Sequence, residues 1–247
     1  MIAEDRYLAI LRFLNQKGSA AVAELSHEVN ASEATIRRDL IILDKQGRLH
    51  KVHGGATSVT EEFISGERDV ITKLRMNMTE KESIARYAAS LIYDDDFIFI
   101  DAGTTTLLML EYISNTKATF VTTGIAHARR MVEKGLKAFV IGGMLKVGTE
   151  AIVGCQAVSG LSTYNFTKAF IGSNGISIKQ GFTTPDTEEA LVKAKAMEQS
   201  HMSYILADSS KFGKVSAVSF APIGKACIIT DKLPDESYSS YTVIKEV

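Results

Sequence analysis

One predicted helix, over residues 33–46, constrains the fold of this chain more than any other segment. Ile36, Leu40 and Leu43 recur at positions i, i+4 and i+7, which is the spacing of a single apolar face on an α-helix. The threonine before Ile36 and the two arginines after it point away from that face, because neighbouring positions on a helix differ by about 100°. We therefore expect a helix that is buried on one side and that presents hydrogen-bond donors to solvent or to a ligand on the other.

The residues around this helix predict a winged helix-turn-helix domain. A first helix over residues 4–16 ends at a glycine, and Ser19 opens a second, short helix. Residues 29–31 form a turn, because Asn30 tolerates the left-handed backbone conformation that tight turns require. After the long helix, residues 48–56 alternate between polar and apolar side chains and then reach a turn at two glycines. This pattern is typical of a small β-hairpin, or wing. Helix, short helix, turn and long helix is the order of elements that places a recognition helix in the DNA major groove.

This first domain carries the residues that we expect to contact DNA. The formal net charge of the whole chain is −1, which is not the charge of a protein that binds nucleic acid over its entire surface. Between residues 32 and 57, however, five lysines and arginines stand against three carboxylates, and the local distribution of charge steers binding. Donors near the start of the long helix can reach base edges and phosphates, and the tip of a wing can touch phosphates. The expected DNA-binding residues are Ser32, which also caps the helix, Glu33, Thr35, Arg37, Arg38, Lys51 and His53.

The remainder of the chain predicts an α/β domain with a mostly parallel sheet. Residues 58–78 are polar and irregular, so we assign them to a linker between a first domain of residues 1–57 and a second domain of residues 79–247. Thr79 and Glu82 form a capping box at the start of the next helix. Short apolar runs then alternate with helical stretches, which implies parallel strands covered by helices on both faces. The apolar runs lie at residues 97–100, 119–122, 138–141, 168–171, 204–207 and 226–229.

A threonine-rich turn follows the first of these strands and is the main candidate for ligand binding. In an open α/β sheet, ligands bind at the carboxyl ends of the strands. A glycine that allows close approach of the backbone, followed by hydroxyl groups at the start of a helix, suits a phosphate or a sugar. An ordinary strand-to-helix turn with a threonine cap is the alternative. The turn is neither a Walker loop nor a dinucleotide fingerprint, and its candidate residues are Asp101, Gly103, Thr104, Thr105 and Thr106.

Other residues at strand ends extend this candidate effector site. Each turn taken alone could be purely structural, but several turns at one edge of the sheet can line a single pocket. Lys211 could offer an ammonium group to a phosphate or could simply be solvated. Lys193 could do the same or could pair with Glu189, one helical turn before it. The additional candidates are Thr123, Gly124, Gly142, Gly143, Lys193 and Lys211.

Several classes of function find no support in the sequence. The five histidines and the two cysteines, Cys155 and Cys227, show no metal-ligand spacing, and no nucleophile-and-base pattern suggests catalysis. We therefore expect neither a metal nor a cofactor. No apolar run approaches the roughly 20 residues of a membrane span, and the N-terminus lacks an apolar signal segment. The expectation is a cytoplasmic protein with reduced thiols and no membrane partner.

Two groups of residues match the pattern of one known family. In the first domain they are Arg6, Ile10 and Leu14 in the first helix, together with residues 35–40 and 52–56. In the second domain they are Lys193 and residues 101–106, 170–172, 181–184, 189–190 and 208–211. With these motifs the chain resembles the DeoR family of bacterial transcriptional regulators over nearly its whole length. The segment around residues 151–153 matches no motif, which leaves the specificity of the pocket open.

The resemblance implies a sensor domain whose fold is similar to ribose-5-phosphate isomerase and which usually binds a phosphorylated sugar or polyol. It also implies that residues 101–106, Lys211 and Lys193 contact this effector. Members of the family usually repress operons for sugar uptake and catabolism and act as homo-oligomers. Within the family, the chain most resembles regulators of fructose or related phosphotransferase-system sugars. We therefore expect a repressor that binds double-stranded operator DNA and that a phosphorylated sugar releases.

A second hypothesis is an enzyme, namely a sugar-phosphate isomerase that carries a DNA-binding appendage. The sheet and its phosphate-type turn are compatible with this hypothesis, and Asp101 or Glu189 could be the base. The predicted N-terminal helices favour the hypothesis of a regulator, because an isomerase does not need them. An activator in place of a repressor is a third hypothesis, since the residues do not distinguish the sign of regulation, the effector, the operator sequence or the number of subunits.

Overall fold

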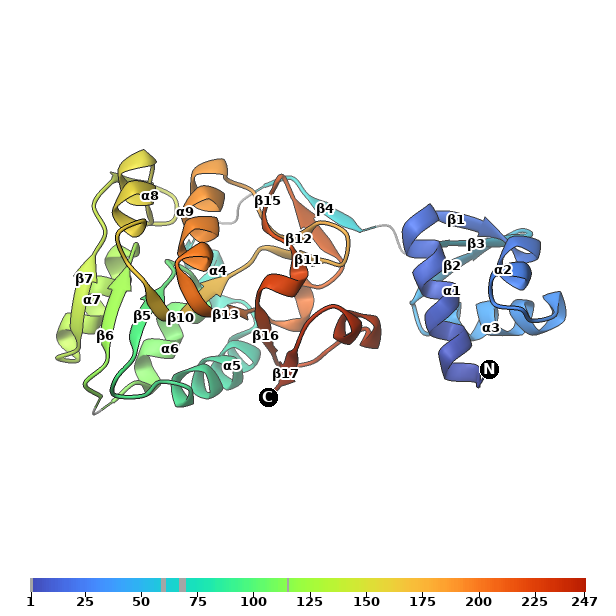
Figure 1. The fold of residues 1–247 in the computed structure, drawn as a ribbon, viewed down its shortest axis with the longest axis horizontal. Helices are drawn as coiled ribbons and strands as arrows, with labels where there is room; N and C mark the ends of the chain where they lie inside the picture. The colour runs from blue at the N-terminus through green and yellow to red at the C-terminus, as the bar shows by residue number, and fades with distance from the viewer. Residues whose placement is uncertain (1, 59–60, 67–69, 115) are drawn as a thin grey trace. The chain divides into compact units, whose positions relative to one another are not determined.

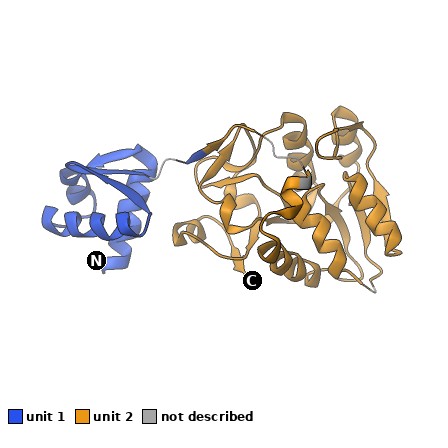
Figure 2. Cartoon of the chain, turned by 180° about the vertical axis from the view of Figure 1, so that it is seen from behind, with its two compact units in different colours: residues 1–62 blue, residues 63–247 orange. Residues whose placement is uncertain are grey.

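The chain folds into two compact units, one ending at Glu62 and the other beginning at Phe63 (Figure 2). The structure is a computed structural model that describes residues 2–58, 61–66, 70–114 and 116–247. Part of the segment expected to be a linker, at residues 59–60 and 67–69, lies outside the described residues. The described part of that segment contains strand β4 (Glu62–Ile64) and helix α4 (Val70–Arg75).

The first unit is a three-helix domain with a small antiparallel sheet (Figure 1). Its apolar core is built from the predicted stripe, because Ile36, Leu40 and Leu43 are fully buried together with Ile10 and Leu14. The strand order is β1-β3-β2, with β2 and β3 forming the predicted wing. The elements are α1 (Ala3–Lys17), β1 (Ser19–Ala21), α2 (Val22–Glu28), α3 (Glu33–Lys45), β2 (Leu49–Val52) and β3 (Gly55–Ser58).

The prediction that Ser19 opens the second helix is wrong. Ser19 begins strand β1, and α2 starts three residues later at Val22. The cause is long-range pairing, since Ser19 lies opposite Thr57 and Ala21 lies opposite Gly55 in the antiparallel ladder with β3. At Gly55 a Cβ atom would lie 2.2 Å from the carbonyl oxygen of Ala20, so only glycine permits this close approach of the two strands.

The second unit contains a seven-stranded sheet in which the described strand pairs are parallel, as the alternating pattern predicts. The strand order is β17-β16-β13-β10-β5-β6-β7. The carboxyl ends of neighbouring strands therefore meet along one edge, where the predicted ligand turns follow them. The strands are β5 (Phe97–Ile100), β6 (Thr119–Thr122), β7 (Lys137–Val140), β10 (Phe166–Gly172), β13 (Ser200–Leu206), β16 (Cys227–Thr230) and β17 (Ile244–Glu246).

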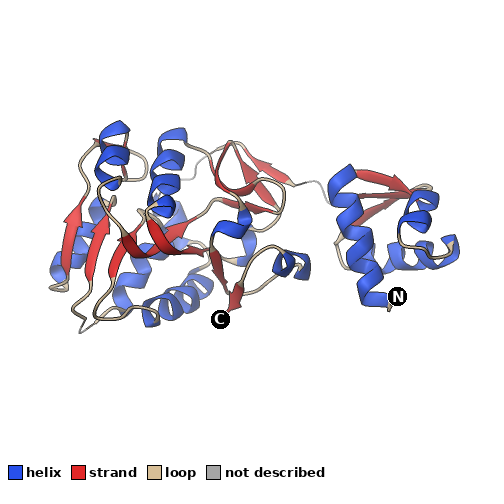
Figure 3. Cartoon of the chain, in the orientation of Figure 1, coloured by secondary structure: helices blue, strands red, loops and turns tan. Residues whose placement is uncertain are grey.

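Helices cover both faces of this sheet (Figure 3). Side chains of a strand alternate between faces, so Phe99 belongs to one core cluster whereas Ile98 and Ile100 belong to the other. The face with Ile98 is covered by α5 (Met78–Ser90), α6 (Thr104–Met109), the short turn η1 (Leu110–Tyr112) and α7 (Ile125–Glu133). The face with Phe99 is covered by α8 (Cys155–Leu161) and α9 (Thr187–Glu198). No helix of the described residues is long and apolar enough to cross a membrane.

The predicted capping box at Thr79 and Glu82 is wrong. Helix α5 begins at Met78, and its N-cap is Asn77, which adopts a left-handed backbone conformation with φ of 52°. The side-chain amide of Asn77 does not cap the helix and donates instead to Asp208 Oδ1 and Ser210 Oγ, at 2.9 and 3.2 Å. A tertiary contact to the segment after β13 has therefore replaced the local one.

A second, antiparallel sheet of order β11-β12-β15 lies beside the parallel one and was not expected from the sequence. Thr183 and Thr184 are fully buried residues of β12. Asp186 caps the helix that follows this strand. The remaining elements are β8 (Met144–Leu145), β9 (Ile152–Val153), β11 (Gly175–Ser177), β12 (Gly181–Thr184), η2 (Ser209–Lys211), β14 (Lys214–Ser216), β15 (Val218–Ala221), η3 (Ile223–Lys225) and η4 (Glu236–Ser240).

Candidate DNA-binding surface and effector site

The N-terminal end of α3 presents the expected polar side chains. The Ser32 hydroxyl accepts a hydrogen bond from the backbone N–H of Thr35 at 3.2 Å, which confirms the predicted N-cap. Arg37 and Arg38 are exposed, and Arg37 forms an i, i+4 ion pair with Glu33 at 2.9 Å. Such an exposed pair contributes roughly 0.3–0.5 kcal/mol, so Arg37 can leave Glu33 for a phosphate at little cost.

A charged pair that the sequence reasoning missed holds α3 against α1. Asp39 is 3% exposed, and its two carboxylate oxygens accept from Arg6 Nε and Nη2 at 2.6 and 3.1 Å. Asp39 lies in the apolar stripe between Ile36 and Leu40, so a carboxylate at a buried helix position was the available signal. This pair fixes the orientation of the helix that carries Arg37 and Arg38.

The wing packs on α3 through the buried Leu49, and a side-chain hydrogen bond from α3 also holds it. Asp44 Oδ1 accepts a hydrogen bond from the backbone N–H of Lys51 at 2.9 Å. The Lys51 and His53 side chains remain exposed, and the hairpin turns at Gly54, whose φ is 81°. The first unit thus leaves all the expected DNA-binding side chains exposed except that of Thr35, which is half-buried.

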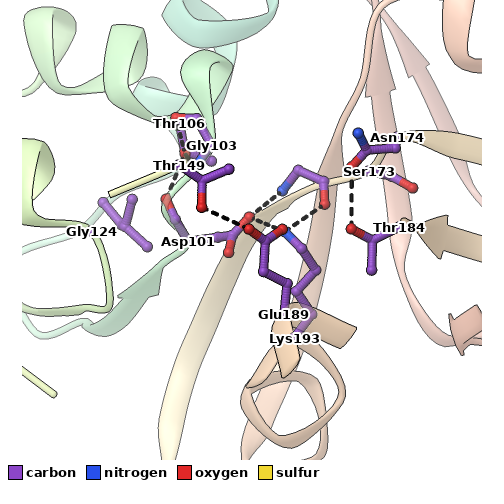
Figure 4. A network of polar contacts seen from close by, with 12 residues as sticks. Asp101, Gly103, Thr106, Gly124, Thr149, Ser173, Asn174, Thr184, Glu189 and Lys193 are labelled. Carbon is purple, nitrogen blue, oxygen red and sulfur yellow. Dashed lines mark hydrogen bonds and ion pairs between the residues drawn. The ribbon is translucent and has the colours of Figure 1, made fainter. Parts of the chain in front are cut away.

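In the second unit, a buried ion pair lies at the carboxyl end of β5 (Figure 4). Lys193 of α9 donates to Asp101 Oδ2 at 2.5 Å and to the carbonyl oxygen of Gly172 at 3.2 Å. The same carboxylate oxygen accepts from the backbone N–H of Gly172, which ends β10. The predicted i, i+4 pair of Lys193 with Glu189 is therefore wrong, because the strand-end carboxylate offers Lys193 a buried partner.

Glu189 instead belongs to a second polar cluster on the same helix. Its Oε1 accepts from the Thr149 hydroxyl at 2.8 Å (Figure 4). The same oxygen accepts from Lys146 Nζ at 3.0 Å. Lys146 also pairs with Asp186 at 3.1 Å. Burial alone would raise the pKa of Asp186, but the N–H of Glu189 and the Lys146 ammonium together lower it. The loop between β8 and β9 is thereby tied to the start of α9.

The threonine turn is held in shape by hydrogen bonds of its own. The Thr106 hydroxyl, which is fully buried, accepts from the N–H of Gly103 and lies 2.6 Å from the carbonyl oxygen of Asp101. His127 Nε2 lies 3.1 Å from both Thr106 Oγ1 and the carbonyl oxygen of Gly103. Because a carbonyl oxygen only accepts, the contact with Gly103 places the imidazole proton on Nε2. Burial lowers the pKa of His127 to about 4, so this imidazole is neutral at pH 7.

The other expected effector residues occupy three different surroundings. Gly124 is packed against His127, and Thr123 is buried with its carbonyl oxygen accepting from the N–H of Ile152. Gly142 and Gly143 follow β7, and a Cβ atom on Gly143 would lie 2.6 Å from the carbonyl oxygen of Val153. Thr105 is buried, whereas Thr104 and Lys211 are half-buried near the start of α5. The structure therefore brings Asp101, Gly103, Thr106 and Lys193 into one hydrogen-bonded set and leaves the rest around it.

Four residues of this region were absent from the sequence-based candidates. Lys146, Thr149 and His127 carry no local pattern that marks them, since their partners are 21 to 43 residues away. Lys81 did carry a signal, because it lies three and four residues before the buried Ile84 and Ala85 on the apolar face of α5. No group of three or more side chains within the described residues could hold a metal ion.

A winged helix-turn-helix unit followed by a parallel α/β unit with buried polar residues at its strand ends defines a two-unit regulator. Family comparison agrees: residues 6–62 match the DeoR-like helix-turn-helix domain and residues 76–232 match the DeoR C terminal sensor domain. The chain therefore belongs to the DeoR family of helix-turn-helix transcriptional regulators.

Two curated relatives are similar over almost their entire length. An uncharacterized HTH-type transcriptional regulator FruR of Bacillus subtilis is 41% identical over 251 residues, covering 100% of this chain and 99% of the relative. A lactose phosphotransferase system repressor of Staphylococcus aureus is 34% identical over 239 residues, covering 96% and 94%. Both relatives are named as regulators and not as enzymes, in agreement with the expectation for this chain.

A solved structure of ribose-5-phosphate isomerase A from Methanocaldococcus jannaschii is also similar to part of the chain. It covers 55% of each chain with a TM-score of 0.42 and 15% sequence identity.

Proposed function

We propose that this regulator is a repressor whose α3 reads operator DNA. The observation that carries the proposal is the arrangement of α3, which is buried along Ile36, Leu40 and Leu43 and exposed at Arg37 and Arg38. A helix fixed on one face can hold guanidinium groups in a groove without further ordering. The exposed Lys51 and His53 of the wing are proposed to contact phosphates, as is the first turn of α3 with Ser32, Glu33 and Thr35.

The effector is proposed to be a phosphorylated sugar that binds at the carboxyl ends of the parallel strands. A buried pair such as Asp101 and Lys193 gives a polyol both hydrogen-bond acceptors and donors in a site of low dielectric constant. Thr106 is proposed to shape its turn because its hydroxyl already bonds the backbone of Gly103 and Asp101. Thr123 is proposed to do the same because its carbonyl oxygen accepts from the N–H of Ile152. The proposed contacts are Asp101, Gly103, Thr104, Thr105, Gly124, Gly142, Gly143, Lys193 and Lys211.

The name of the lactose phosphotransferase system repressor favours a sugar of that system. Fructose is the first to test, because the sequence resembles regulators of fructose-type sugars. Two recognition helices are needed to read repeated half-sites, so the proposal includes a homo-oligomer. The effector would favour an arrangement of the oligomer that binds DNA weakly. Its effect on operator affinity can be no larger than the difference between its affinities for the two arrangements.

A thermal-shift screen over phosphorylated sugars, followed by operator binding with and without the best ligand, tests the proposal. We expect a sugar phosphate to raise the melting temperature and to weaken operator binding, whereas the unphosphorylated sugar does neither. An unchanged melting temperature and unchanged operator affinity across the whole series would refute sensing of sugar phosphates. Turnover of ribose 5-phosphate or fructose 6-phosphate by the purified chain would instead indicate an enzyme.

A further inference from the structure

Helix α3 exposes two neighbouring isoleucines that do not belong to the core of the first unit. Ile41 is 43% exposed and Ile42 is 40% exposed, whereas Leu40 and Leu43 on either side of them are fully buried. The solvent face of a helix that packs on a core normally carries charged or polar residues. Isoleucine is also not a strong helix former, so helix propensity does not explain its presence on this face. The two side chains therefore require another explanation.

Ile41 points away from the core of the first unit. Because successive residues of a helix differ by about 100°, Ile41 is turned about 140° from the buried Ile36 and about 160° from the buried Leu43. Ala34 is exposed and lies seven residues earlier, within about 20° of the direction of Ile41. The line through Ala34 and Ile41 is thus the part of α3 farthest from the core, and it is apolar.

Cationic side chains flank this apolar line. Arg37 lies about 40° to one side of Ile41 and Arg38 about 60° to the other, and both arginines are exposed. Lys45, which is also exposed, follows Ile41 by about one turn. A helix with its side chains is roughly 10–12 Å wide, and the major groove is about 12 Å wide. When α3 lies in the groove, its outward line therefore faces the base edges, between the two guanidinium groups.

The charges around Ile41 favour DNA over a second copy of the chain as the partner of this surface. In a two-fold symmetric interface the same surface meets itself, so Arg37, Arg38 and Lys45 would approach their counterparts. Like charges placed opposite each other are unfavourable, whereas the phosphates of DNA complement them. Ala34 and Ile41 are also too small to supply most of the roughly 800 Å² per partner that a stable protein interface buries.

We propose that Ile41 determines operator specificity by packing against the 5-methyl group of a thymine. This methyl group is the apolar feature that distinguishes thymine in the major groove, and an apolar side chain removes it from water. The inference rests on the proposed function, because it requires α3 to lie in the groove, and it adds a residue that recognises one base. Ile42 is turned about 100° from Ile41, so its short side chain does not reach the same base edges.

Replacing thymine by deoxyuridine tests the contact, because it removes the methyl group and leaves base pairing unchanged. The full chain first selects its operator from random duplexes, and each thymine of the selected site is then replaced in turn. We expect one replacement within a half-site to weaken binding of the parent chain about fourfold, the factor that corresponds to one buried methyl group. Ile41→Ala should bind the thymine and the uracil operators with equal affinity.

Two further variants control this comparison. Ile41→Val keeps a branched apolar side chain and should retain the preference for thymine. Ile42→Ala makes the same change as Ile41→Ala at the adjacent, equally exposed position, and it should prefer thymine as the parent chain does. Both alanine variants are expected to melt no lower than the parent chain, because alanine is the stronger helix former.

The outcomes separate this inference from the proposed function. If the parent chain prefers no duplex sequence, reading of an operator by α3 and the thymine contact are both refuted. If the chain selects an operator but Ile41→Ala distinguishes thymine from uracil as the parent does, the contact is refuted while the proposed function stands. Loss of the preference in Ile42→Ala alone would also refute the assignment to Ile41. Equal weakening of all operators by Ile41→Ala, with a change of oligomeric state in light scattering, would place Ile41 in a contact between subunits and overturn the inference.

Discussion

At the scale of single residues, the decisive side chains of this molecule are polar groups on apolar helix faces. Asp39, Lys81 and Lys193 all lie at buried helix positions, and two of them are paired, with Arg6 and with Asp101. Their helical positions could be read from the spacing of apolar residues, but their partners could not. Those partners lie 33 and 92 residues away, and only the folded chain brings them together.

The buried imidazole of His127 makes stability depend on pH in a defined window. Burial lowers the pKa of His127 from 6.5 to about 4, so between these values the unfolded chain binds more protons than the folded one. Stability therefore falls as the pH decreases from about 6.5 to 4, by an amount on the order of 3 kcal/mol. His127→Gln, which is neutral throughout, should flatten the change in melting temperature over this range. The exposed His201 offers a control, and an equally steep profile for His127→Gln would contradict the assignment.

The two arginines at the start of α3 are expected to differ in their roles. Adjacent helix positions diverge by about 100°, so one guanidinium should read a base while the other contacts a phosphate. Replacing the arginine that contacts a base by alanine should cost about 1–3 kcal/mol of binding free energy at one operator position. Replacing the arginine that contacts a phosphate should weaken binding to all operator sequences alike. Mobility-shift titrations of Arg37→Ala and Arg38→Ala against operator variants measure this difference. Lys17→Ala on α1 controls for lost charge. Unchanged operator affinity in both arginine variants would contradict the proposal that α3 reads the operator.

At the scale of elements, the apolar pattern of the sequence was sufficient to predict the long helices and the parallel strands. It was not sufficient to predict the short antiparallel strands. The parallel strands and their covering helices follow from alternating apolar runs, and α3 follows from one stripe and its cap. Strand β1 and the β11-β12-β15 sheet could not be predicted, because three or four residues hold too few side chains to set a period. Their existence depends on pairing with distant strands. The strand-end candidates were placed on the correct edge of the sheet. Which of them touch one another depends on α9, which carries Lys193, and on Gly172 at the end of β10.

Two adjacent glycines follow β7 and allow a test of how the turn after β7 packs against β9. A Cβ atom on Gly143 would lie 2.6 Å from the carbonyl oxygen of Val153 in β9, whereas Gly142 has nothing within 4 Å. We expect Gly143→Ala to destabilise the protein by about 1–3 kcal/mol, because the backbone of β9 must move. Gly142→Ala should change stability by less than about 0.5 kcal/mol. Denaturant unfolding of both variants measures the difference, and equal stabilities would contradict the packing of β9 on this turn.

At the scale of the whole molecule, recognition and sensing reside in units with separate cores. The first unit buries its own apolar cluster around Leu40, and the second buries two clusters on the faces of its sheet. Each unit can therefore keep its own core intact. A ligand at the strand ends would act on DNA binding through the assembly of subunits and through the segment that contains α4.

This division predicts that operator binding depends on the helical phase of the half-sites. Two recognition helices held in one assembly match half-sites about 34 Å, or about 10 base pairs, apart. Inserting about 5 base pairs between the half-sites should turn one of them to the opposite side of the duplex and reduce affinity strongly. Inserting about 10 base pairs returns both half-sites to the same side of the duplex and should reduce affinity less. Titration of the full chain against the three operators tests this expectation, with a single half-site as the reference for binding by one subunit. Equal affinities for all three spacings would mean that the subunits bind independently, and the oligomeric repressor would have to be abandoned.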